Sequence, residues 1–133
     1  MSVIVRNSYG AIAVNKGVIE RMIIEDMLAM SDSLIMCNKS AKPIKDKPTP
    51  FIDPDYFDSV EVSDKKDFIK VKVYIIVKFG NNISDVADML FETIENDFLL
   101  LKLRKPDVIK IKVRGIMSDE LVKRNIDVVR DND

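Results

Sequence analysis

The sequence predicts an α+β fold, a two-layer sandwich in which two main helices cover one face of a mostly antiparallel sheet of about four strands. Three observations lead to this prediction. Residues 68–79 alternate apolar and polar side chains, which is the period of a strand with one buried face. Residues 16–30 and 85–101 repeat apolar side chains at three- and four-residue steps, the period of a helix. Strands and helices alternate along the chain, so packing the helices against a single sheet is the economical arrangement.

Each element has its own start and stop signals. Asn15 is expected to cap the first helix through its side-chain oxygen, and Ser84 is expected to cap the second. Basic residues ahead of Pro106 are expected in the last turn of the second helix, where they complement the helix dipole. The expected strands are residues 9–14, 34–37, 59–63, 68–79 and 108–117.

The 133 residues are expected to form one domain, because 47% hydrophobic and 32% charged residues are typical of a chain that packs a single core. Residues 38–57 hold four of the five prolines and are predicted to be a proline-rich loop insertion. Tyr56 and Phe57, with Phe51, are expected to pin its second half to the body. Residues 118–133 are predicted to be a charged C-terminal tail that begins with a short helix.

The composition argues against several kinds of catalytic and metal-binding site. The absence of histidine removes the commonest general base and the histidine-containing zinc sites. The single Cys37 is expected to be a small buried hydrophobe, and the acids of residues 53–58 lack the glycine that a calcium loop needs. The sequence therefore predicts a non-enzymatic protein with no cofactor, no metal and no small-molecule substrate. The lack of a signal-peptide core and of a long apolar run favours a cytoplasmic location.

One acid of the first helix conflicts with this pattern. Asp26 lies near the middle of the apolar face formed by Ile19, Met22 and Met30, where a carboxylate is unfavourable without a partner. Either the helix is rotated so that Asp26 reaches the edge of that face, or the acid is buried for a functional reason.

Two strands carry rows of cations on their outward side. If these strands are neighbours, like charges lie close and destabilise the sheet by up to about a few tenths of a kcal/mol per pair, unless Glu61 or an anionic partner offsets them. The candidate partner-binding residues are Lys70, Lys72, Lys78, Lys110, Lys112 and Arg114.

Three interpretations of these cations stay open. The face docks acidic protein segments or anionic headgroups, or it binds nucleic acid, or it is a solvated face whose lysines discourage edge pairing. Nucleic acid is disfavoured because Tyr74 is the only aromatic residue expected on that face, whereas stacking platforms normally need more.

Two leucines of the second helix project away from its apolar stripe. Leu99 and Leu103 are expected either to be covered by another part of the chain or to form a contact between copies in a homo-oligomer. They are the candidate oligomer contact.

Three segments, YGAIAVNKGVIERM, VYIIVKFGNNISDVADMLFETI and VIKIKVRGI, resemble in sequence and order the alkaline shock protein family, also called Gls-type general stress proteins. The resemblance covers about residues 9–31 and 68–117, and its most specific part is residues 73–94. It implies a non-enzymatic protein of mainly Gram-positive bacteria that responds to cell-envelope stress. It also implies self-association and docking to a protein partner, such as a membrane anchor, at the inner face of the cell membrane.

Overall fold

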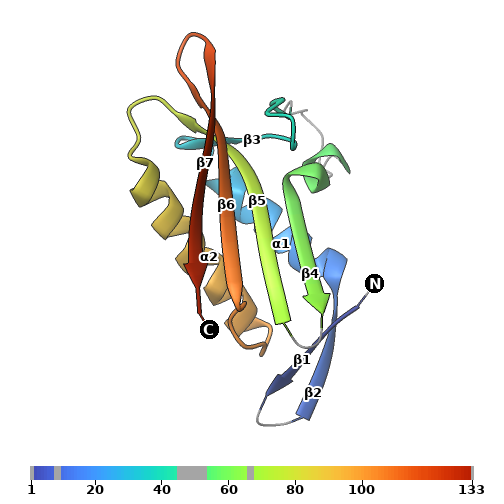
Figure 1. Ribbon diagram of the computed structural model, residues 1–133. Coiled ribbons are helices and arrows are strands. Elements are labelled where there is room, and N and C mark those ends of the chain that lie inside the picture. The colour runs from blue at the N-terminus through green and yellow to red at the C-terminus, as the bar shows by residue number, and fades with distance from the viewer. Residues whose placement is uncertain (1, 8–9, 45–53, 66–67, 133) are drawn as a thin grey trace.

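The computed structural model describes residues 2–7, 10–44, 54–65 and 68–132, and they form a sheet with helices on one side (Figure 1). The helices α1 (Lys16–Ala29) and α2 (Ile83–Leu100) both lie behind the sheet in this view. The predicted two-layer α+β sandwich is confirmed, with five strands in the main sheet. These strands are β3 (Leu34–Met36), β4 (Val60–Lys65), β5 (Phe68–Lys78), β6 (Val108–Met117) and β7 (Leu121–Asp131).

β5 is the centre of the main sheet. Along one edge its first half pairs with β4 and its second half with β3, both antiparallel. Along the other edge it pairs with β6, and this pair is parallel because α2 carries the chain back across the sheet between them. β7 follows β6 as an antiparallel partner and ends the sheet.

A separate two-stranded sheet precedes α1. It pairs β1 (Ser2–Asn7) with β2 (Gly10–Asn15) in antiparallel register and extends beyond the main sheet (Figure 1). The sequence predicted β2 but not β1. Asn15 then caps α1 as predicted, since its Oδ1 accepts a hydrogen bond from the Gly17 amide at 2.7 Å.

The limits predicted for α2 are wrong at both ends. Asn82 and not Ser84 is the N-cap, because Asn82 has extended backbone and its side chain accepts from the Asp85 amide. The helix ends at Leu100, and Lys102 has a positive φ of 65°, so the chain leaves the helix before the basic residues that were expected in its last turn.

Alternate residues of β5 fill the interface between the sheet and the helices, as predicted. The exception is Phe79, which was expected on the buried face but is 75% exposed because β5 ends one residue earlier, at Lys78. The β5 residues buried on the side that faces the helices are Ile69, Val71, Val73, Ile75 and Val77, each at most 1% exposed. Across the interface they meet the buried α2 residues Leu90, Ile94 and Phe98 in one core.

A second, smaller cluster buries the upper part of the opposite sheet face. It contains Cys37, Tyr74 and Ile76, with Met117 and Leu121 packed against them. Cys37 is fully buried, as expected, and burial raises the pKa of its thiol to about 12. Tyr74 is only 3% exposed, although the strand alternation predicted that it lies on the partly solvent-exposed face of β5.

The predicted proline-rich loop is described in part. Tyr56, in the short 3-10 helix η1 (Pro54–Ser59), is buried and Phe57 is partly buried against the core, so the expected pinning by these two residues is confirmed. Phe51, Asp53 and the central prolines lie outside the described residues.

The prediction of a charged tail over residues 118–133 is wrong, because β7 is an integral strand. Val128 lies opposite Ile111 and Ile126 opposite Val113 in the register with β6, and both β7 residues pack on the core. Charged residues between them hid this alternation. The inward-facing Arg130 is accommodated by an ion pair with buried Glu95 at 2.9 Å.

Removal of residues 119–133 therefore tests whether this segment is a strand or a tail. We expect the truncated chain to lose at least about 3 kcal/mol of unfolding free energy, the scale of losing a large core side chain, because β6 loses a partner and part of the core is uncovered. Denaturant unfolding measures the loss. As a control, Arg124→Ala removes a charge but keeps the strand and should change stability by less than about 0.5 kcal/mol. Full stability of the truncated chain would contradict the role of β7.

Candidate functional site

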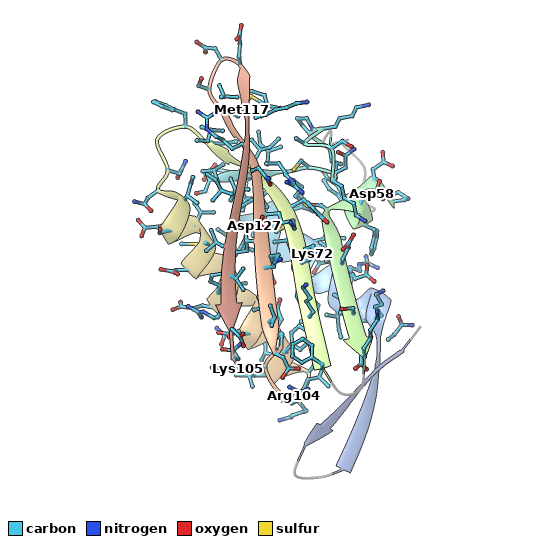
Figure 2. The ribbon with its side chains drawn as sticks, viewed as in Figure 1. Asp58, Lys72, Arg104, Lys105, Met117 and Asp127 are labelled. Atoms are coloured by element: carbon cyan, nitrogen blue, oxygen red, sulfur yellow. The ribbon has the colours of Figure 1, made fainter. Side chains whose placement is uncertain are left out.

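The candidate site is the outer face, defined as the side of the main sheet that is turned away from α1 and α2. Figure 2 shows Lys72 and Asp127 on this face, on β5 and β7 respectively. In the parallel β5–β6 register, Lys72 lies opposite Lys110 and Tyr74 lies opposite Lys112. The two cation rows are therefore neighbours, which is the arrangement in which like charges destabilise a sheet.

Acids at the margins of the outer face offset some of these cations. From β4, Glu61 lies 3.8 Å from the Lys72 ammonium and 2.5 Å from that of Lys39. From β7, the Asp127 carboxylate lies 3.3 Å from the Lys112 ammonium. Glu61 was anticipated from the sequence, whereas Asp127 was missed because its segment was taken for a tail.

The cations at the lower end are less well compensated. Neither Lys70 nor Lys110 forms an ion pair with any described residue. The pKa of Lys70 is lowered, first by burial and then by the positive charges of Lys110, Lys72 and Lys112. We call Lys70, Lys72, Lys110 and Lys112 the basic patch.

The other two predicted cations, Arg114 and Lys78, do not belong to the basic patch. The Arg114 guanidinium donates to Asn125 and lies 5.7 Å from the centre of the Tyr74 ring, so it is held by the upper apolar cluster. Lys78 is at the far end of β5, roughly 26 Å along the strand from Lys70. It lines a separate cavity of about 210 Å³ with residues that include Met27.

A shallow hollow adjoins the basic patch between β4 and β5. Its volume is about 320 Å³, and its lining is Glu61, Ser63, Lys65, Phe68, Lys70 and Lys72. Phe68 is 40% exposed in this hollow, whereas Tyr74 was the aromatic residue predicted on this face. Strand parity identifies Phe68, because it precedes Lys70 by two residues and so projects to the same side.

The two leucines proposed as an oligomer contact have different surroundings. Leu103 is 3% exposed and belongs to the main core, so for this residue the alternative of coverage by the chain itself holds. Leu99 is 47% exposed and the adjacent Leu100 is 74% exposed. Only Leu99, of the two, remains available for contact with another copy.

Asp26 meets a second acid where α1 packs against α2. Its pKa is raised to about 8, first by burial and then by the neighbouring carboxyl group of Asp97. The Oδ2 atoms of both residues are buried and have no hydrogen-bond partner among the described residues. Asp26 is half-buried and so lies between the two alternatives drawn from the sequence, a solvated edge of the apolar face and a fully buried acid.

The raised pKa of Asp26 predicts a pH dependence of stability. The folded chain holds this proton more tightly than the unfolded chain, so stability falls as pH rises from the ordinary pKa of 3.8 to about 8 and then levels off. Asp26→Asn should remove this fall and raise stability at pH 9 by on the order of 1 kcal/mol, a value reduced for the partial exposure of the site. Thermal unfolding across pH measures it, with Glu92→Gln, an exposed acid of α2, as the control. Parallel pH profiles for wild type and Asp26→Asn would refute the assignment.

Comparisons of the chain with protein-family models, with curated proteins and with solved structures find no match. Among the described residues, no group of three His, Cys, Asp or Glu side chains is arranged to hold a metal ion. Within the same residues, no helix has both the length and the apolar character needed to cross a bilayer.

Proposed function

We propose that this chain is a non-catalytic envelope-stress protein that self-associates and docks, through the basic patch, to an acidic segment of a membrane-linked protein partner. The observation that carries the docking proposal is the pair Lys70 and Lys110, which add like charge beside Lys72 and Lys112 without an acidic partner among the described residues. The envelope role and the membrane link rest on the resemblance of residues 73–94 to the alkaline shock protein family.

The energetic argument is that the basic patch works against the fold. Every cation added beside the others raises the electrostatic free energy of the folded sheet, and partial burial of Lys70 adds a desolvation cost for its charged ammonium group. An anionic ligand removes this cost when it binds. A surface that is destabilising alone and compensated by a partner is typical of binding sites, where stability and function are in tension.

An acidic protein segment suits this surface better than a nucleic acid. Tyr74 is buried, so Phe68 is the aromatic residue available beside the patch, and a single ring gives little stacking. Glu61 and Asp127 border the cations on both sides, and these acids would repel a long phosphate backbone. A short acidic segment can lie along the cations between them.

Non-catalytic action is supported by the residues that would have to do chemistry. The sequence has no histidine, and the Cys37 thiol is fully buried with a pKa of about 12, so it is not available as a thiolate nucleophile. In the open hollow beside Lys70, Ser63 carries the one hydroxyl of the lining, and that hydroxyl forms no hydrogen bond with a described residue that could act as its base. We propose a cytoplasmic location at the inner face of the membrane, reached through the partner.

Binding of a fluorescently labelled oligoglutamate peptide tests the docking proposal. We expect Lys70→Glu with Lys110→Glu to weaken binding at least about tenfold, because each reversed cation loses an attraction of about 1 kcal/mol or more. Fluorescence anisotropy at low and moderate salt measures the affinity, which should fall with salt. The matched control reverses two exposed cations elsewhere, Lys42→Glu with Lys105→Glu, and should bind like wild type.

The same substitution separates a binding surface from an ordinary solvated face. Lys70→Glu places a carboxylate beside Lys72 and Lys110, so we expect it to raise the unfolding free energy by about a few tenths of a kcal/mol while it weakens peptide binding. Unchanged peptide binding would refute the docking proposal. Tighter binding of single-stranded RNA than of the peptide, lost in Phe68→Ala, would favour the nucleic-acid alternative instead.

A further inference from the structure

β7 is a long strand with one open edge. It has 11 residues and, in the part of the chain that the structure describes, pairs only with β6. Figure 1 shows it at the margin of the main sheet. Two of its apolar side chains are half exposed, Val122 at 45% and Val129 at 49%. An edge of this length is a template for pairing with another strand.

The register with β6 fixes which β7 side chains share a face. Ile126 and Val128 lie opposite buried β6 residues and point toward the helices. Asp127 and Val129 lie opposite Lys112 and Lys110 and point to the outer face. By the same alternation, Lys123 lies on the outer face with Asp127.

A second copy of β7 is the partner that this edge fits. In an antiparallel pair related by a two-fold axis, opposed residues share a face, so the central residue lies opposite its own copy. Centring the pair on Arg124 or Asp127 opposes two like charges. Centring it on Ile126 leaves Lys123 opposite Val129 and Arg124 opposite Val128.

Centring the pair on Asn125 gives a complementary register. Lys123 then lies opposite Asp127 of the other copy, twice by symmetry. Val122 lies opposite Val128, and Leu121 lies opposite Val129, so the half-exposed valines gain apolar neighbours. Within one copy, Lys123 has no ion pair with a described residue. Asp127 forms an ion pair with Lys112, which lies on the β6 side of β7.

We propose that two copies of this chain form a symmetric dimer by antiparallel pairing of β7 about Asn125. The charges on β7 favour this register, because Lys123 meets Asp127 twice in it, whereas the adjacent registers oppose Arg124 to its own copy or leave Lys123 opposite Val129. Arg130 takes no part, since Glu95 and the Phe91 ring hold it inward. An interface of one strand pair is small, and such interfaces are typical of weak, reversible complexes.

The dimer has a consequence for docking. A two-fold axis perpendicular to the sheet joins the two main sheets into one and keeps both basic patches on the same side. A partner with two acidic segments is then bound by both patches at once, which raises its overall affinity. This inference rests on the self-association part of the proposed function and is independent of the ligand of the basic patch.

Charge exchange tests the pairing in the full chain. We expect Lys123→Asp alone and Asp127→Lys alone each to weaken the dimer at least about tenfold in sedimentation equilibrium, because each opposes like charges twice. An equimolar mixture of the two variants should dimerise again. In the mixed dimer the introduced aspartate faces the introduced lysine, and the native Asp127 of one variant faces the native Lys123 of the other. Lys42→Asp, an exposed cation that follows β3 at the opposite edge of the sheet, is the control and should dimerise like wild type.

A disulfide test does not depend on these charges. Asn125→Cys places two cysteines opposite each other with Cα atoms about 4.5 to 5.5 Å apart, within the range that a disulfide spans. It should oxidise to a covalent dimer, whereas Val129→Cys, whose copies lie roughly 26 Å apart, should not. Asn125 loses only an exposed hydrogen bond from Arg114, and buried Cys37 adds no background.

Three results would overturn the inference. One is a monomer at every concentration, and another is equal cross-linking of Asn125→Cys and Val129→Cys. The third is a dimer that Leu99→Asp abolishes and Lys123→Asp leaves intact, which would retain self-association but locate it on α2. Oligoglutamate binding by Lys123→Asp reports on the basic patch separately, so loss of the dimer with normal binding of one peptide per copy leaves the docking proposal standing.

Discussion

β5 pairs along both of its edges while its inner side chains are buried beneath the helices, and every other feature of the molecule is placed relative to this strand. Two-edged pairing satisfies the backbone of β5, and burial of its alternate residues supplies the largest continuous part of the core. The parallel β5–β6 pair follows from this position, because α2 must lie across β5 before the chain can return. The cation rows of both strands are neighbours for the same reason.

The outer face is divided by what covers it. At its upper end, Cys37 after β3 packs with Tyr74 and Ile76, together with Met117 at the end of β6 and Leu121 at the start of β7, so this half of the face is a second core. At its lower end the cations have no such cover, and Lys70 is crowded by like charges. A strand with uniform alternation in its sequence therefore has two different outer halves, one apolar and structural, the other charged and available to a partner.

Like charges lie close together at two places in the molecule. The basic patch concentrates positive charge on the exposed face, and the Asp26–Asp97 contact concentrates acid between the helices, where a proton on Asp26 relieves it. The buried charge of Glu95, in contrast, is neutralised by an ion pair with Arg130. The contrast indicates that the unpaired cations are not required by the fold, which is consistent with selection for binding.

Periodicity alone was sufficient for the elements whose burial is one-sided and regular. The alternation of Ile69 through Val77 and the α2 stripe around Leu90 determined the strand, the helix and the side each buries, because side-chain direction follows directly from backbone period. β7 was not readable, since Arg130 occupies an inward position that looks exposed in sequence and is accommodated only by Glu95, a residue 35 positions away. The candidate site was likewise predicted only in part. The outward direction of Lys70 and Lys110 follows from the alternation in the sequence. Only the tertiary structure decided that Asp127 offsets Lys112, that Phe68 lines the hollow and that Lys78 lies far from the basic patch. Ion pairs and the burial of side chains on the outer face depend on which strands become neighbours, and the sequence pattern does not give this.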